Sequence, residues 1–411
     1  MKTIKIGLIG RYQAKQSDRR GAAMVLAVAM LIVVFGIAAF TVDFGILNVT
    51  KGQIQNAADS AALAAMQDLI QGFGPGATVT SQTAAENAGQ TAKEIVAKFR
   101  SGDVGSTDLN IERDVRFGRR SWDPATGAWV KDWNTTPYNM VEVSVRRTRA
   151  SGAPLGTVFS QFLGFQAFDL EARSVASVAP TTGFKIPTRP ASDTNSGSWT
   201  GDTIDILPIA LDLTTWNNLV SQIRSNTSYG FLDQRRYTPY ATDTISWGND
   251  GVPEVDIYPD ANSDLPPGNR GTVDIGSPDN STADLKRQIV HGVNASDLAF
   301  FPDGVLKFNE QGFLFLNGDT GISAGIEASL KSIIGEVRAI PIFIDVSGPG
   351  NNAQYTIVKF VGVRIMAVKL TGGPTQRYVS VQPAPYSTRF TTRGNAVVNV
   401  DSILSQPLLI E

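Results

Sequence analysis

The longest apolar stretch of the chain runs from Gly21 to Val42 and contains no charged residue. A helix of about 20 apolar residues crosses the hydrocarbon core of a bilayer. Only a helix satisfies its own backbone hydrogen bonds there without a partner strand. The pattern therefore predicts a transmembrane helix over residues 21–42, with a short tail on one side of the membrane and a large soluble region on the other.

The charges beside this stretch predict its orientation. Residues 1–20 carry six cations and one anion, a net charge of +5, whereas the other flank opens with Asp43. Cytoplasmic flanks are enriched in Lys and Arg, so we expect a basic cytoplasmic tail over 1–20 and an exported remainder. A cleaved secretory signal is the alternative, but its apolar region usually spans about 7–15 residues.

The pattern directly after Asp43 predicts a second apolar helical segment, from Leu47 to Gln71. Alanine, the best helix former, dominates it. Residues at three- and four-residue spacing share one helix face: Ile54, Ala58, Ala61, Ala65 and Leu69. Because Leu63, Met66 and Ile70 lie on the opposite side, this helix needs apolar neighbours on more than one side. We expect it to continue the transmembrane helix. Its face could pack within the chain or contact another subunit.

The next residues predict an α+β domain over 43–179. Residues 81–100 have the pattern of an amphipathic helix, and 155–163 that of a short one. Strands are predicted by alternating apolar positions at 109–117, 128–130, 140–146 and 168–178. The 123–127 segment, Asp-Pro-Ala-Thr-Gly, is a typical hairpin turn. The expected layout is one long helix packed on a small antiparallel sheet.

A linker and a second domain are expected beyond this point. Residues 180–200 are rich in Thr, Ser, Pro and Gly, a composition typical of linkers. Residues 201–411 predict a β-rich domain, with helices at 216–223, 284–291 and 325–334 and a long central strand at 354–370. A run at 396–400, AVVNV, is a further strand candidate.

Composition narrows the chemistry. The chain has no cysteine, which excludes disulfides, thiol catalysis and Cys-type zinc sites. Its single histidine, His291, disfavours Ser–His–Asp catalysis and histidine-rich metal centres. The whole chain has a net charge of −2, so the exported part is mildly acidic and unsuited to nucleic acid. We therefore predict no catalytic residue, no cofactor, no metal site and no small-molecule substrate, although an Asp/Glu hydrolase stays open.

Two sets of charged residues lead to separate predictions. Carboxylates scattered among Asn and Gly are expected to be solvated loop residues, with a Ca²⁺ site as the alternative: Asp250, Glu254, Asp256, Asp260, Asp264 and Asp274. Their spacing matches no EF-hand loop.

Arginines on the predicted strands are expected at a solvated sheet edge rather than in a ligand site: Arg116, Arg119, Arg120, Arg146, Arg147 and Arg149.

A family resemblance rests on the N-terminal segment. Arg19-Arg20-Gly21, the apolar span, Asp43, Leu47 and the run from Gln53 to Ala64, QIQNAADSAALA, occur in this order. The segment resembles the N-terminal part of the TadE/TadG-like Flp pilus-assembly proteins, components of the bacterial tight-adherence (Tad) secretion apparatus. A weaker resemblance continues to Val178.

The resemblance implies a membrane-anchored, non-catalytic component of a Tad/Flp-type pilus or secretion system in a bacterial inner membrane. Its N-terminus is then cytoplasmic, the bulk of the chain periplasmic or extracellular, and the 43–179 domain pilin-like. Partners would be the lipid bilayer, pilin-like or Tad secretion-system proteins, and further copies of the chain. Type IV prepilins carry Glu five residues into the mature chain, but Leu26 stands there, so we expect no cleavage after Gly21. The alternative is a membrane-tethered periplasmic module, 201–411, that binds a ligand such as Ca²⁺ or acts as a hydrolase.

Overall fold

The structure is a computed structural model. It describes residues 18–77, 79–187, 202–225, 227–238, 244–258, 271–276, 281–320, 322–348, 353–373, 376–393 and 401–410. Several predictions fall outside these residues: most of the basic tail, the strand candidate at 396–400, and the carboxylates Asp260 and Asp264.

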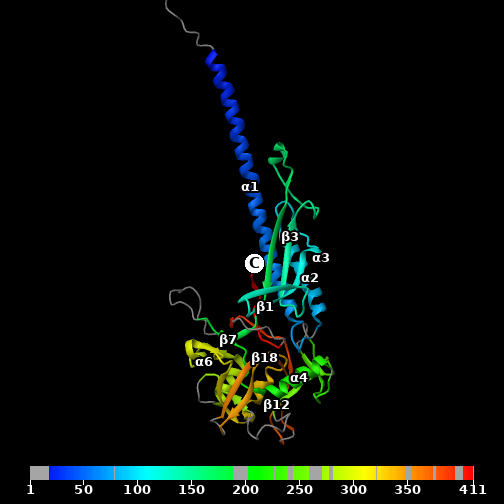
Figure 1. The fold of residues 1–411 in the computed structure, drawn as a ribbon, viewed down its shortest axis with the longest axis vertical. Coiled ribbons are helices and arrows are strands. Elements are labelled where there is room, and N and C mark those ends of the chain that lie inside the picture. Colours follow the sequence, from blue (N-terminus) through cyan, green and yellow to red (C-terminus); the bar gives the residue numbers. More distant parts are fainter. Residues whose placement is uncertain are drawn as a thin grey trace, which may run out of the picture.

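The dominant element is a single helix, α1 (Asp18–Ile70), of 53 residues. At 1.5 Å per residue it is about 80 Å long, and it forms the long axis of the molecule in Figure 1. The predicted continuity between the apolar span and the Ala-rich segment is confirmed, as is the β-rich C-terminal region. The helix ends where Gly72, Gly74 and Gly76 cluster, and Gly74 takes a positive φ of 95°.

The second half of α1 packs on a five-stranded antiparallel sheet, with α2 (Ser81–Ala97) beside it. The sheet order is β2-β1-β3-β6-β23. Its strands are β1 (Val115–Asp123), β2 (Ala128–Trp133), β3 (Met140–Arg147), β6 (Leu170–Ser177) and β23 (Leu408–Leu409). The short α3 (Ile111–Asp114) leads into β1. The predicted turn at 123–127 joins β1 to β2 as a hairpin. We call this unit the helix–sheet body.

The core of the helix–sheet body lies between α1, α2 and the inner strands. Alanines on α1 allow close approach of these elements, and Val141, Val143 and Val145 project from β3 into the same core. Strand β3 is central, because it pairs with β1 on one side and with β6 on the other. Strand β6 contacts α1 as well, so the helix covers the middle of the sheet.

A second unit, the β-rich body, lies at the C-terminal end of α1 (Figure 1). Its seven-stranded sheet contains β9 (Leu211–Asp212), β12 (Val255–Tyr258), β13 (Gly271–Val273), β16 (Leu314–Thr320), β17 (Val337–Ser347), β18 (Ala353–Lys369) and β19 (Tyr378–Pro383). The predicted long central strand is confirmed, since β18 pairs with β16, β17 and β19.

Helices cover this larger sheet. Side chains of α4 (Leu213–Ser225), α5 (Thr282–His291) and α7 (Glu327–Lys331) share one apolar core with β17, β18 and β19. Trp216 and Leu330 are two of its fully buried members. His291 ends α5 and is exposed, so it is not placed for chemistry.

Short elements complete the β-rich body. The paired strands are β8 (Thr203–Ile204) with β14 (Val293–Asn294), β10 (Arg235–Thr238) with β11 (Thr244–Trp247), and β20 (Ser387–Thr388) with β22 (Leu404–Ser405). The remaining turns are α6 (Ala295–Leu298), η2 (Pro302–Gly304) and η3 (Ala324–Ile326).

The two bodies are joined by more than one chain crossing. The expected linker, 180–200, begins instead as strand β7 (Thr181–Lys185), between β15 (Val305–Lys307) and β21 (Thr391–Arg393). That expectation was wrong for these residues because Phe184 is fully buried and its ring lies 5.1 Å from that of Phe360. The chain end also returns to the helix–sheet body, where β23 pairs with β6. The expected boundary between domains stays a prediction.

Candidate functional site

The first half of α1 has no protein neighbours for most of its length. It is long and apolar enough to cross a membrane, and none of its most apolar 18-residue window is buried within the described chain. Large side chains such as Leu31, Ile32 and Phe35 are each more than half exposed. This segment is a candidate membrane anchor, in agreement with the predicted span over 21–42.

A projection of the helix–sheet body reaches back along this exposed segment. We call residues 148–168, which connect β3 to β6, the tip. The tip contains β4 (Leu155–Gly156), the 3₁₀ turn η1 (Ser160–Leu163) and β5 (Ala167–Phe168). Figure 1 shows it rising beside α1, away from the β-rich body. The helix predicted over 155–163 is therefore limited to one 3₁₀ turn, because β4 pairs with β5 at its base.

Asp43 of α1 binds the tip through three consecutive backbone N–H groups. Its carboxylate accepts hydrogen bonds from the N–H of Val158 at 2.9 Å, of Phe159 at 3.0 Å and of Ser160 at 2.5 Å. Burial would raise the pKa of Asp43, but the hydrogen bonds from Ser160, Val158 and Phe159 outweigh it and lower the pKa to about 2. Hydrogen bonds to the charged form have this effect. The carboxylate therefore fixes the tip to the helix just beyond the predicted span.

The sequence predicted Asp43 only as a boundary charge. Its partners lie 115 to 117 residues away, so no local pattern reports the contact. The position of Asp43 directly after an apolar stretch was a signal for such a contact. A carboxylate there needs hydrogen-bond donors if it is buried.

A second attachment lies farther along α1. The Gln53 side chain accepts a hydrogen bond from the Gly102 N–H at 2.8 Å. Gly102 has φ +64°, and a Cβ there would lie 2.7 Å from Thr50 Oγ1 and 2.8 Å from a methyl group of Leu155. The turn after α2 is therefore wedged between α1 and the base of the tip.

Arg147 holds this turn and the tip base together. It donates hydrogen bonds to the carbonyl oxygens of Ala153 at 2.7 Å and Pro154 at 3.1 Å, and it forms an ion pair with Asp103 at 2.7 Å. It also donates to the Ser101 carbonyl. The expectation of a solvated arginine was wrong here, because Arg147 is only 2% exposed. Its guanidinium can satisfy several carbonyls at once.

The other arginines of that set lie nearer to solvent. Arg116 lies over the Trp133 ring at 4.4 Å, and Arg120 lies over Trp129 at 4.2 Å. Arg149 pairs with Asp169 at the base of the tip, with both side chains substantially exposed. These contacts are those of a sheet surface rather than of a ligand site.

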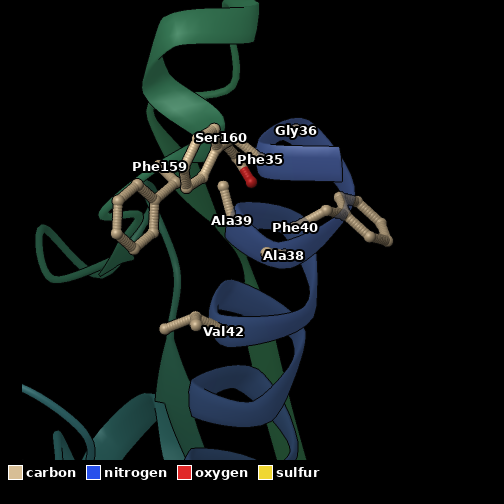
Figure 2. Close-up of a pocket in the computed structure, with 8 residues that line it drawn as sticks. All are labelled: Phe35, Gly36, Ala38, Ala39, Phe40, Val42, Phe159 and Ser160. Carbon is tan, nitrogen blue, oxygen red and sulfur yellow. The ribbon is translucent and has the colours of Figure 1, made fainter. Parts of the chain in front are cut away.

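Apolar hollows separate α1 from the tip on both sides of Asp43. One, of about 400 Å³, lies between α1 residues 35–42 and the tip residues Phe159 and Ser160. Figure 2 shows Phe35 and Ala39 on the side of α1 that faces Phe159 and Ser160, whereas Phe40 points away. The other hollow, of about 610 Å³, lies between α1 residues 42–53, the 100–103 turn and tip residues Leu155–Val158. Both are groove-like and largely apolar.

The predicted interaction face of α1 is buried within the chain. These residues are at most 2% exposed and lie in the core of the helix–sheet body: Ile54, Ala58, Ala61, Ala65 and Leu69. A partner could reach them only if this core opened. Contact of the helix with another subunit stays a prediction, and in this structure it would use the exposed side chains of α1.

The predicted carboxylate set is spread over the β-rich body. No group of three metal-ligating side chains occurs among the described residues. Asp250 and Glu254 instead accept hydrogen bonds from the backbone of the β10 region, with Glu254 bonded to the N–H of Gln234 and Arg235. Asp274 lies after β13 and is buried.

One polar cavity of about 500 Å³ does contain two of these carboxylates. Glu254 and Asp256 line it together with Arg235, Tyr378 and Ser380. Burial raises the pKa of both carboxyls. This effect is larger than the opposite effect of their hydrogen bonds and of the Arg235 charge, which lower the pKa. The polar lining of this cavity suits a polar ligand.

Comparison with known proteins yields a match for the segment that contains the candidate anchor. A family model, Tad, described as "Putative Flp pilus-assembly TadE/G-like", matches residues 21–68. The resemblance noted in the sequence is thereby confirmed for this segment. No curated protein and no solved structure matches the chain. The matched residues cover the exposed half of α1, Asp43, Gln53 and most of the buried face.

Proposed function

We propose that the protein is a membrane-anchored, non-catalytic component of a Tad/Flp-type pilus or secretion system. The observation that carries this proposal is that the Tad model covers residues 21–68, which contain both the exposed apolar half of α1 and its buried Ala-rich half. The match supports a pilus-assembly role. Anchoring through 21–42, a cytoplasmic N-terminus, a periplasmic location and a pilin-like helix–sheet body are our inferences from charge and layout.

The layout supports a structural role in two ways. The long α1 carries the helix–sheet body directly on the anchor, so forces on one are transmitted to the other. The exposed α1 residues between the membrane and the core, such as Val49 and Asn56, are accessible to a partner, whether a pilin-like subunit, a Tad secretion-system protein or a second copy.

The first test is site-specific photo-crosslinking in membranes of the native host. A photoreactive residue at Val49, which is exposed on α1, should capture pilin-like or secretion-system proteins, identified by mass spectrometry. The matched control is Val130, which is exposed on β2 and lies at the sheet edge. Equal capture at both positions, or capture of no such protein, would contradict the proposal.

The orientation of the chain in the membrane is tested by labelling single introduced cysteines. This is possible because the chain has no cysteine of its own. A Trp247→Cys variant places one thiol on an exposed site of the β-rich body. We expect a membrane-impermeant maleimide to label it in intact spheroplasts, whereas Lys2→Cys should react only after lysis. The reverse result would invert the proposed topology.

The cavity at Arg235 favours one alternative function, a tethered ligand-binding or hydrolytic module. Its two carboxyls with raised pKa and one arginine are the chemistry that such a site needs. If this alternative holds, Ca²⁺ should raise the melting temperature of the full-length protein in detergent, and Glu254→Gln should abolish the rise. An unchanged melting temperature would leave the structural role alone supported.

A further inference from the structure

We propose that the tip inserts into the same membrane that α1 crosses, with Val158, Phe159 and Phe165 among the acyl chains of the lipids. The exported part would then hold the bilayer at two points, a spanning helix and a monotopic tip. This inference rests on the anchoring of residues 21–42 in the proposed function, and not on a pilus role.

The depth of the tip follows from the helix. Arg19 and Arg20 mark the inner boundary of the span, and a hydrocarbon core of about 30 Å takes about 20 helical residues. The outer boundary therefore falls close to Val42. Because the tip lies beside residues 35–42 of a continuous α1, its end reaches about 10 Å below that boundary at 1.5 Å per residue. Interfacial elements bury their apolar faces to a similar depth of about 5–10 Å.

The surface chemistry of the tip suits lipid rather than water. Residues 150–168 contain no charged side chain. Val158, Phe159 and Phe165 are 47%, 40% and 61% exposed, although they lie on the projection farthest from the β-rich body. Exposed apolar clusters on soluble surfaces are uncommon and mark contacts with proteins or membranes. The apolar hollow between Phe159 and α1 continues this surface (Figure 2).

Several polar groups of the tip have partners within the protein, which lowers the cost of insertion, whereas the buried Ser160 hydroxyl has none among the described residues. Asp43 accepts from the N–H groups of residues 158–160. The Thr157 hydroxyl donates to the Phe165 carbonyl at 2.6 Å, and the Gln161 amide donates to the Val158 carbonyl at 2.8 Å. The Phe165 N–H donates to the Ser160 carbonyl at 3.0 Å. These bonds reduce the number of backbone groups that would lose water on entering the bilayer.

The charges nearest to the tip lie at its base. Arg149 and Asp169 form an exposed ion pair there, and Arg149 also donates to the Ala167 carbonyl. This arrangement has apolar side chains at the end and charges at the base. It matches the change from acyl chains to headgroups, and the cation is placed where lipid phosphates would be.

The test uses the full-length chain in phosphatidylethanolamine–phosphatidylglycerol vesicles, with one cysteine per variant labelled by an environment-sensitive fluorophore. The variants are Phe165→Cys on the tip, Phe35→Cys on the anchor and Trp247→Cys on the β-rich body. All three side chains are exposed, so the substitutions leave the core intact. Lipids that carry a quencher on the acyl chain should reduce the emission of the Phe165 and Phe35 labels to a comparable extent and leave the Trp247 label unchanged.

The outcomes separate the tip from the anchor. Quenching at Phe35 without quenching at Phe165 would overturn the inserted tip and leave anchoring intact. Absence of quenching at both sites would overturn the anchoring on which the proposal rests. A short bismaleimide can also be added to the Phe165→Cys variant. If it joins two copies through the introduced thiols, in proportion to protein density, a second copy covers the tip and the lipid contact is excluded.

Discussion

The two halves of α1 both carry apolar faces but have opposite surroundings. Residues 24–42 carry mainly large side chains, and these are about half to three quarters exposed. Residues 54–70 are rich in alanine, and their apolar face is at most 4% exposed. Both halves need apolar neighbours, yet only the second finds them within the chain. Small side chains let a sheet and a second helix approach closely, whereas the large ones form an exposed apolar surface of the kind expected for a candidate membrane span.

The change between the two halves occurs over three turns of the helix. Asp43 and Gln53 bracket it, and each accepts hydrogen bonds from a different part of the helix–sheet body. These two polar side chains therefore lie where the surroundings of α1 change from exposed to buried.

The largest effect is expected in the buried half. Ala61→Asp places a carboxylate at a fully buried position, which should lower the free energy of unfolding by about 4 kcal/mol or more. The matched control is Gln67→Asp on the exposed face of the same helix, where about 0.5 kcal/mol or less is expected. Thermal melting in detergent, followed by tryptophan fluorescence, measures both. Equal shifts would mean that the face is not packed as described.

The same substitution in the exposed half should act differently. Ile32→Asp lies near the centre of the span, where an aspartate costs about 2.5–3.5 kcal/mol of insertion free energy. We expect a smaller fraction of protein to resist alkaline extraction from membranes, with the melting of the exported part unchanged. Ile32→Leu should behave as the unsubstituted chain. A melting shift without loss of membrane retention would place this segment inside a protein core.

Adding a single methyl group at the junction between the halves should lower the stability of the protein. Gly102→Ala adds a Cβ that would approach Thr50 and Leu155 within 3 Å, at a residue with φ +64°. Strain of both kinds is expected to cost about 2 kcal/mol. Gly105→Ala is the control, because a Cβ there meets nothing within 4 Å. If both variants melt alike, the turn is not wedged against α1.

The extent of α1 was predictable because local pattern determines it. Apolar length and alanine content in one continuous segment predict the candidate span and its helical continuation, whereas the orientation stays a prediction. Strands β3 and β6 and the turn at 123–127 were predictable for the same reason, since alternation and turn residues act over a few positions. The strand expected over 109–117 was wrong for its first part, because α3 (Ile111–Asp114) precedes β1 (Val115–Asp123). The identity of the neighbours was not, because Ala61 would look the same facing a sheet or another subunit.

The site at the junction depends on contacts across the chain. Arg147 appeared to be an edge arginine, but its acceptors are carbonyl oxygens at 101, 153 and 154, which carry no sequence signal. The residues of β7 predict a linker because Thr and Gly dominate them, yet Phe184 and the neighbouring Ile186 lie in a core and the strand pairs on both sides. The sequence therefore does not predict long-range contacts to backbone carbonyl oxygens, or the burial of a short strand by a few apolar side chains.

The smallest effect concerns pH and the hold of Asp43 on the tip. Its pKa is lowered from 3.8 to about 2, so the charged form is favoured in the folded state. The resulting stabilisation is complete above the unfolded pKa and is lost as the pH falls through the folded pKa. A label at Phe165→Cys in detergent micelles should therefore report increasing tip mobility between about pH 4 and pH 2.

Asp43→Asn should flatten this profile and leave the tip partly mobile at every pH, because an amide offers one acceptor oxygen where the carboxylate offers two. Asp169→Asn, which alters only the exposed base of the tip, should retain the profile. If the Asp43→Asn profile matched that of the unsubstituted chain, Asp43 would not be the group that holds the tip against α1.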